Sequence, residues 1–312
     1  MPAKPEVCRT RAYIDRMSNT NASPVAAEQL TIPVAAGGSV TGILRTPSGG
    51  SPAAAVVIHS ATAVAQRLYT GFAEYLCENG CAVLTYDYRG IGTSGRPKQY
   101  RNLRMRDWME QDVPAAAEWM AARFPGLPQF AVGHSLGGQS LVLGNGTERL
   151  AGFVAVGSHG GVTRAVEVRR ERIRVTLVLR FIGPMCARLL GFAPARRLGL
   201  GEDMPGTAVL EWSGWSRKPG YFFDDPGMRA AERAAGVRTD VLAVGLSDDL
   251  WATPAQLAPF FGHLVNARVQ LRNYTPGDVG VAAIGHMGFF RRGMKDKLWP
   301  DILEWLKERI PN

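Results

Sequence analysis

The chain has 312 residues, 46% of them hydrophobic, and a formal net charge of +9 at pH 7. This length and composition provide a large buried core, which excludes a disordered or fibrous protein. The positive charge is concentrated between Arg164 and Arg197, but no helix-turn-helix, zinc-finger or RNA-motif pattern accompanies it, so we expect no nucleic-acid partner.

The N-terminal segment, residues 1–27, is predicted to be an extension outside the folded core. It carries basic residues without a continuous apolar stretch after them, unlike a secretory signal, so we expect a cytoplasmic protein. The four cysteines form no CxxC pair and have no histidine cluster beside them, which argues against a metal site or a disulfide framework. They are Cys8, Cys77, Cys81 and Cys186.

Strands and helices are predicted to alternate along residues 28–158 and again along 239–312, which we assign to one α/β core. An antiparallel hairpin is expected around the turn at Gly37-Gly38. Continuous apolar runs then indicate strands buried on both faces of a parallel sheet. These runs are residues 53–59, 81–88, 129–133, 150–157, 239–245 and 268–274, with helices expected at about 67–78, 106–124, 136 onward and 294–309.

Residues 159–238 are predicted to form an inserted helical cap, because they show helical periodicity without a convincing sheet strand. The most apolar part, residues 173–192, is about long enough to cross a bilayer. It contains arginines and the pair Gly183-Pro184, so we expect two helices hinged at that pair and no membrane span.

Gly133-His134-Ser135-Leu136-Gly137 is a G-x-S-x-G sequence between a predicted strand and a predicted helix. This context is typical of a nucleophile elbow, in which a tight turn holds the serine hydroxyl at the carboxyl edge of the sheet. A chance glycine-rich turn is the alternative. We therefore take Ser135 as the candidate nucleophile.

A serine nucleophile needs a histidine base and an acid that orients the histidine. His286 follows the last predicted strand and precedes the terminal helix, where the base is expected in the chain order serine, acid, histidine. Asp248 and Asp249 both follow the strand at 239–245. We choose Asp248 as the acid and keep Asp249 as the alternate.

Two backbone N–H groups are needed to stabilise the oxyanion. The sequence assigns one to Leu136, directly after the nucleophile, and the second to Ala61 in the loop after the 53–59 strand, with Thr62 as the alternate. A literal G-x-G-x-x-G at residues 90–95 lacks the following helix of a dinucleotide site, so we interpret it as a structural loop.

With these residues placed, the chain resembles the α/β-hydrolase superfamily: a mostly parallel central sheet flanked by helices, with a helical cap. Residues 86–92 and 133–138 resemble the serine aminopeptidase and monoglyceride-lipase-like branch. The similarity is closest to a bacterial group of predicted α/β-hydrolases of undefined substrate, through Gln66-Arg67, residues 212–223 and residues 285–290. The resemblance implies Ser135, Asp248 and His286 as a triad, and no cofactor.

The leading function is hydrolysis of a carboxylic ester or thioester through an acyl-enzyme, with a small acyl substrate that is apolar or amphipathic. An acyltransferase, or a non-catalytic ligand-binding protein on the same scaffold, is the alternative. The cap leaves room for peripheral membrane contact, and the sequence does not indicate an oligomeric state. Apolar cap residues are expected to line a pocket, with arginines facing water or an anionic head group. They are Leu177, Leu179, Phe181, Leu189 and Leu190, with Arg174, Arg180 and Arg188.

Overall fold

The computed structural model describes residues 25–199 and 201–311. The expected absence of a secretory signal and the residue Cys8 lie outside these residues. The first described strand begins at Val25, before the expected boundary at residue 28, because Val25 pairs with Pro47 of the second strand.

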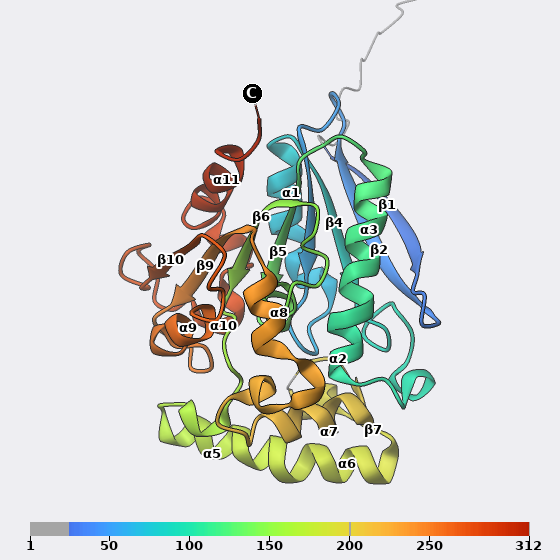
Figure 1. Ribbon diagram of the computed structural model, residues 1–312, viewed down its shortest axis with the longest axis vertical. Helices are drawn as coiled ribbons and strands as arrows, with labels where there is room; N and C mark the ends of the chain where they lie inside the picture. Colours follow the sequence, from blue (N-terminus) through green and yellow to red (C-terminus); the bar gives the residue numbers. More distant parts are fainter. Residues whose placement is uncertain (1–24, 200, 312) are drawn as a thin grey trace, which may run out of the picture.

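Eight strands form one sheet in the order β1-β2-β4-β3-β5-β6-β9-β10 (Figure 1). The first three strands in this order are antiparallel neighbours, and all the others pair in parallel. The strands are β1 Val25–Pro33, β2 Ser39–Pro47, β3 Ala54–His59, β4 Cys81–Asp87, β5 Gln129–His134, β6 Leu150–Val156, β9 Asp240–Leu246 and β10 Val269–Tyr274. The expected mostly parallel sheet is confirmed.

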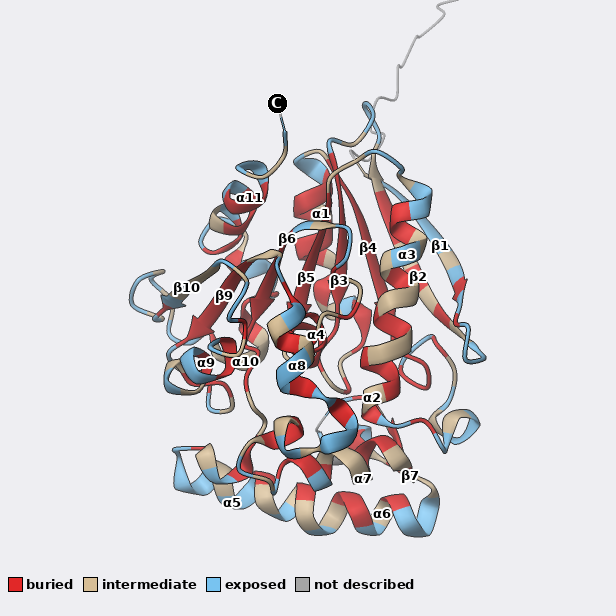
Figure 2. Cartoon of the chain, in the orientation of Figure 1, coloured by how far each residue is buried: buried red, intermediate tan, exposed pale blue. Residues whose placement is uncertain are grey.

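Helices cover both faces of this sheet, so the central strands are buried on both sides (Figure 2). One core cluster packs α1 (Thr70–Glu78) and α11 (Trp299–Lys307) against the sheet. The other packs helices on the opposite face, which are α3 Val113–Arg123, α4 Leu136–Val142, α8 Ala230–Gly236 and α9 Pro254–Phe261. Helix α11 begins five residues later than expected, with Pro300 in its first turn, where a proline needs no N–H partner.

Residues between β6 and β9 add no strand to the main sheet, and α5, α6 and α7 lie together at one end of it (Figure 1). The elements are α5 Arg169–Leu177, a π-helical turn Val178–Ile182, α6 Gly183–Leu190, β7 Phe192–Ala193, β8 Met204–Pro205 and α7 Gly206–Trp215. We call residues 159–238 the cap segment. Strands β7 and β8 form a separate two-stranded sheet.

The expected hinge at Gly183-Pro184 is wrong, because helical backbone runs without a break from Arg169 to Leu190. Pro184 lacks an N–H, so the carbonyl of Arg180 loses its helical partner. The π-helical turn lies directly before this point, and the Arg217 side chain donates a hydrogen bond of 3.4 Å to the Arg180 carbonyl. We call the continuous helix of residues 169–190 the cap helix.

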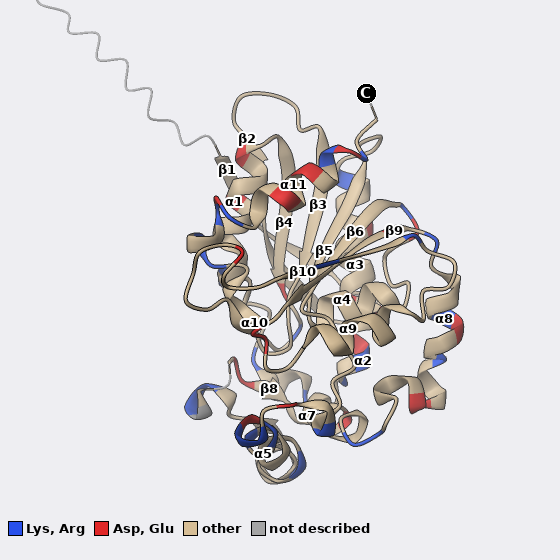
Figure 3. Ribbon diagram, turned by 90° about the vertical axis from the view of Figure 1, so that its left-hand side faces the viewer, with Lys and Arg blue, Asp and Glu red and all other residues tan. Residues whose placement is uncertain are grey.

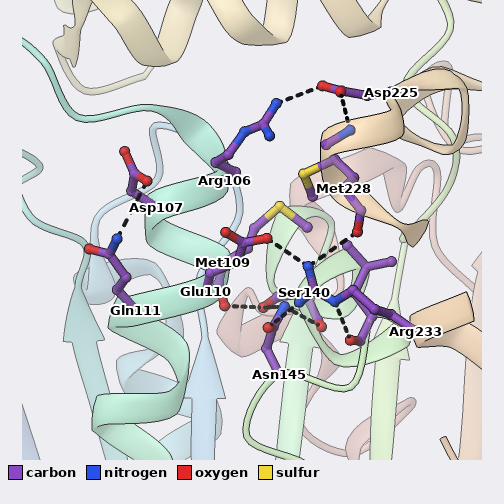
Figure 4. A network of polar contacts seen from close by, with 12 residues as sticks. Arg106, Asp107, Met109, Glu110, Gln111, Ser140, Asn145, Asp225, Met228 and Arg233 are labelled. Atoms are coloured by element: carbon purple, nitrogen blue, oxygen red, sulfur yellow. Dashed lines mark hydrogen bonds and ion pairs between the residues drawn. The ribbon is translucent and has the colours of Figure 1, made fainter. Parts of the chain in front are cut away.

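Partly buried ion pairs join the cap segment to the core (Figure 4). Arg106, in α2 (Met105–Asp107), pairs with Asp225 at 2.6 Å. Arg233 pairs with Glu110 at 2.6 Å and donates to Asn145 at 2.5 Å, after the end of α4. Each contact has one end in the core and the other in the cap segment, so the cap segment has a defined position over the sheet.

The loop with the G-x-G-x-x-G sequence wraps around the carboxylate of Asp87. That carboxylate accepts hydrogen bonds from the Thr93 N–H at 2.8 Å and from the Gln66 N–H at 2.6 Å. A Cβ at Gly92 would lie 2.3 Å from the same carboxylate. The loop therefore closes around the carboxylate at the end of β4, in agreement with its interpretation as a structural loop and not a dinucleotide site.

Candidate active site

Ser135 lies in the turn between β5 and α4, with φ 50° and ψ −109°, a strained conformation for a residue with a side chain. The flanking glycines make the turn possible: a Cβ at Gly133 would lie 2.4 Å from the Gly138 nitrogen, and one at Gly137 would lie 2.3 Å from the His59 carbonyl oxygen. The expected elbow geometry is thus present. It holds the Ser135 side chain at the carboxyl edge of the sheet.

His286 lies in the short helix α10 (Gly285–Gly288), after β10. Its Nδ1 is 2.6 Å from Oδ2 of Asp249, which follows β9 and is 1% exposed. Burial opposes ionisation of this carboxyl, but the charge of His286 and hydrogen bonds from His286, Ala252 and Trp251 lower the pKa of Asp249 to about 2. An ionised Asp249 holds the proton of His286 on Nδ1 and leaves Nε2 as the basic nitrogen.

The structure corrects the expected pairing of Asp248 with His286. Asp248 Oδ2 accepts from the Ile284 N–H at 2.7 Å, and its Oδ1 accepts from the Gly285 N–H at 3.0 Å. Asp249 turns toward His286 because its other oxygen, Oδ1, accepts from the N–H groups of Trp251 and Ala252. Asp248 therefore holds the backbone of the histidine loop, and Asp249 holds the ring.

Ser135 and His286 line the same cavity, although no hydrogen bond joins the Ser135 hydroxyl to the histidine ring in residues 25–199 and 201–311. Contacts between a nucleophile and its base are often loose without substrate and tighten when it binds. Gly157, at the end of β6, closes the other side of the pair, since a Cβ there would lie 3.3 Å from both Asp249 and His286. A larger residue at Gly157 would push against both groups.

The oxyanion loop differs from the sequence expectation at Ala61. The Ala61 N–H donates to the hydroxyl of Tyr69 at 2.8 Å, so in this conformation it is engaged. Thr62, the alternate donor, also lines the cavity. Leu136 is the first residue of α4, where an N–H has no partner within the helix.

A buried chain of hydrogen bonds connects the oxyanion loop to the histidine loop. The Tyr69 hydroxyl accepts from Ala61, so its own hydrogen points to Nδ1 of His134, 2.9 Å away. Nε2 of His134 then donates to the backbone carbonyl of His286 at 2.9 Å. Burial holds the pKa of His134 well below its usual value, which keeps the ring neutral for this role. Tyr69 was not predicted as a site residue, because a tyrosine in the first helical turn after a strand carries no sequence signal.

Trp251 is a second residue that the sequence analysis missed, and it joins the cap helix to the site. Its ring lies nearly parallel to that of His286, with centroids 6.3 Å apart, and its indole N–H donates to Glu171 of α5 at 2.9 Å. The ring of Trp212 in α7 also stacks on that of Trp251, with centroids 6.2 Å apart. A tryptophan two residues after the acid was the available signal.

A cavity of about 600 Å³ lies between the elbow and the cap segment. Its apolar lining includes Val175, Leu179 and Val209. Arg174 also lines the cavity. The expectation for Leu179 is therefore confirmed. Four other residues were expected to line the pocket, and this is wrong. Their side chains are on the outer side of the cap helix, with 49% to 76% of their area exposed. These are Leu177, Phe181, Leu189 and Leu190.

Among residues 25–199 and 201–311, no group of three or more histidines, cysteines or carboxylates is arranged to hold a metal ion. In the same residues, no helix combines the length and apolarity needed to cross a membrane. The cysteines described there, Cys77, Cys81 and Cys186, are free thiols.

Solved structures with this architecture include several hydrolases. A soluble variant of monoglyceride lipase from Saccharomyces cerevisiae matches with a TM-score of 0.65 at 14% identity, over 92% of this chain and 96% of that one. A carboxyl esterase from Bacillus coagulans matches with a TM-score of 0.60 at 15% identity, over 92% and 99%. An esterase from Pyrococcus furiosus matches with a TM-score of 0.59 at 14% identity, over 92% of each.

The sheet, the elbow and these structural relatives define an α/β-hydrolase fold. The family model described as serine aminopeptidase, S33, matches residues 50–251, and the chain belongs to this family of hydrolases. The resemblance inferred from the motifs is thus confirmed. A search of curated proteins found no match.

Proposed function

We propose that this hydrolase cleaves a carboxylic ester or thioester through an acyl-enzyme formed on Ser135. One observation carries the proposal: the strained serine and His286 share a cavity, and the histidine is held by an ionised, buried Asp249. A triad requires these three roles in this order of contacts.

In the first step, Nε2 of His286 takes the proton of the Ser135 hydroxyl while Oγ attacks the carbonyl carbon. The tetrahedral intermediate collapses when the same histidine returns the proton to the leaving alcohol or thiol. A water molecule then attacks the acyl-enzyme by the same two steps and releases the carboxylic acid and free Ser135. Asp249 keeps its charge throughout and stabilises the imidazolium that forms, which its low pKa supports.

The oxyanion is stabilised by the N–H groups of Leu136 and Thr62. Leu136 begins a helix, so its N–H is unpaired and the helix dipole adds positive potential. Thr62 replaces Ala61 in this role because the Ala61 N–H already donates to Tyr69. The Tyr69–His134 chain then acts as a support that fixes the oxyanion loop relative to His286.

Residues 159–238 serve as a cap that forms the acyl pocket, while residues 28–158 and 239–312 form the core. The apolar lining of the 600 Å³ cavity favours a small acyl substrate with an apolar chain. The presence of esterases and a monoglyceride lipase among the structural relatives supports an ester as the scissile bond. A cytoplasmic location stays a prediction, and membrane contact is a separate proposal that depends on the cap surface.

The test is a panel of p-nitrophenyl esters and acyl thioesters of increasing chain length, with a matched amide series. We expect turnover of esters or thioesters and an acyl adduct on Ser135 by mass spectrometry after a rapid acid quench. The Ser135→Ala variant should form no adduct. An adduct that only an added alcohol or amine discharges would instead identify an acyltransferase, and a folded protein without any adduct would identify a ligand-binding scaffold.

A further inference from the structure

The outer side of the cap helix carries a row of exposed apolar side chains, which we call the outer stripe. Its members recur at every fourth residue, and between 50% and 76% of each is exposed. They are Ile173, Leu177, Phe181, Met185 and Leu189. Across residues 25–199 and 201–311, seven of the ten large hydrophobic residues with strongly exposed side chains lie between Val168 and Leu190.

Packing against the rest of the protein does not account for this row. The opposite side of the same helix supplies the buried positions Val175, Leu179, Gly183 and Ala187, again at every fourth residue. The cap helix is thus apolar on two sides, and the rest of the protein covers only one of them. An exposed apolar row of this length marks a surface that meets another apolar phase.

Arginines surround the outer stripe. Residues 164–197 contain nine arginines and two glutamates, a formal net charge of +7 out of +9 for the chain. One of the glutamates, Glu171, has a side chain that is 13% exposed and pairs with Arg174, three residues along the same helix. Arg169, Arg170 and Arg188 are exposed, and in the described part of the chain their side chains have no ion pair. Figure 3 shows this charge on α5, at the end of the molecule away from α11.

Arginines and outer-stripe residues also meet in a groove of about 390 Å³ on this side of the helix. Arg164, Arg172 and Arg180 line it together with Leu177 and Phe181. The buried Nε of Arg180 has no hydrogen-bond partner. A groove with guanidinium groups beside apolar side chains matches a phosphate head group next to its acyl chains.

We propose that the outer stripe and its arginines dock the protein on an anionic membrane surface. An interfacial helix of this kind inserts its apolar side into the head-group region while basic residues bind lipid phosphates. A second copy of the chain is the poorer occupant, because it would bring two segments of charge +7 together. The cap helix is also outermost at its end of the molecule, so a flat surface can reach all of it (Figure 1).

Docking would place the acyl cavity one helix away from the lipid phase. Leu179 lines the cavity from the inner side of the same helix that carries Leu177 and Phe181 on its outer side. Delivery of an amphipathic ester from the membrane rests on the proposed function, whereas the docking itself does not. The experiment therefore measures binding without turnover.

The full-length protein is mixed with sucrose-loaded vesicles of phosphatidylcholine alone or with 30% phosphatidylglycerol, and the bound fraction is measured by sedimentation. We expect binding to the anionic vesicles that falls as NaCl rises. Replacing Leu177, Phe181 and Leu189 together by Ser should weaken it at least tenfold, and replacing Arg169, Arg172 and Arg188 by Gln about tenfold or more at low salt. The matched control is Val265→Ser with Leu271→Ser, which removes exposed apolar residues outside the cap segment.

Circular dichroism and thermal unfolding establish that each variant is folded. Failure of the unchanged protein to bind anionic vesicles at low salt would overturn the proposal, as would equal loss of binding in the control. A dimer that the Leu177/Phe181/Leu189 variant dissociates, measured by analytical ultracentrifugation without lipid, would assign the outer stripe to self-association instead. Vesicle binding by a protein that hydrolyses no ester would leave docking intact and remove only the proposed function.

Discussion

The carboxyl edge of the sheet and the outer side of the cap helix use charged residues in opposite ways. At the sheet edge, two carboxylates are matched to partners: the buried Asp249 accepts from His286, Trp251 and Ala252, and the half-buried Asp248 accepts from two backbone N–H groups. On the cap helix, arginines and apolar side chains lie exposed next to one another. The first region is complete within the chain, and the second has the composition of a surface with an external partner.

Because of this difference, substitutions in the two regions should have different effects. Changes at the sheet edge disturb a network in which each group orients the next, so we expect large, non-additive losses of turnover. Changes on the outer side of the cap helix remove independent contacts with a surface, so they should add and should leave the chemistry unchanged.

The largest effect is expected from the two neighbouring aspartates. Asp249→Asn should lower kcat by about 10³- to 10⁴-fold, because an amide no longer holds the proton of His286 on Nδ1. Asp248→Asn keeps one acceptor for the histidine loop, and its loss should stay within about tenfold. Steady-state kinetics on the best ester of the panel measures both. The reverse order would return the role of the acid to Asp248.

A smaller effect is expected from pH, and it should act on folding stability and leave vesicle binding unchanged. Burial lowers the pKa of His59 to about 3 and that of His159 to about 4. In the unfolded chain each of these histidines has a pKa near 6.5. The unfolded state therefore binds more protons than the folded state at pH values between the folded and the unfolded pKa. Stability is therefore lost as the pH falls below about 6.5, on the order of 2 kcal/mol for each histidine by pH 5.

Urea unfolding at pH 7 and pH 5 measures this loss, and His159→Asn should reduce it while leaving the part that belongs to His59 and to His134, whose pKa burial also lowers. The low pKa of Asp249 adds a further loss only below about pH 4, where its carboxyl is protonated first in the unfolded chain. Residues 164–199 contain no histidine, so vesicle binding should change little over the same range. An unfolding free energy that is equal at both pH values would contradict the buried neutral state of these rings.

The smallest effect is expected from the inner side of the cap helix. Leu179→Ala enlarges the cavity, so the preferred acyl chain should lengthen, with a change of about fivefold to tenfold in the kcat/KM ratio of long to short esters. Phe181→Ala is the matched change on the outer side and should leave this ratio within twofold. Equal shifts in both variants would show that specificity does not depend on the cavity side of the helix.

The sequence predicts the sheet edge better than it predicts the cap. Ser135 and His286 could be found because the elbow and the loop after the last strand have fixed places in the fold. The choice of Asp248 over Asp249 was wrong, since adjacent side chains in a turn point in different directions and the sequence does not show which one faces His286. What decides it is the backbone: Trp251 and Ala252 donate to Asp249, and a sequence pattern does not show these N–H directions.

The cap helix was predicted to be broken and to face the cavity with most of its apolar residues. The spacing of four residues already separates two apolar rows, one through Leu179 and one through Phe181, on opposite sides of a helix. The π-helical turn at Val178–Ile182 lies directly before Pro184, and the Arg180 carbonyl in it accepts a hydrogen bond from the Arg217 side chain. Such a tertiary contact is not visible in the local sequence.

The central claim is that Ser135 is a nucleophile activated by the pair His286–Asp249. Labelling with a fluorophosphonate probe, followed by peptide mass mapping, tests it most directly because the probe reacts with an activated serine and needs no knowledge of the substrate. We expect a single adduct on Ser135, none on folded Ser135→Ala, and labelling slowed by at least 10³-fold in Asp249→Asn. An adduct on another residue, or undiminished labelling of folded Ser135→Ala, would contradict the account.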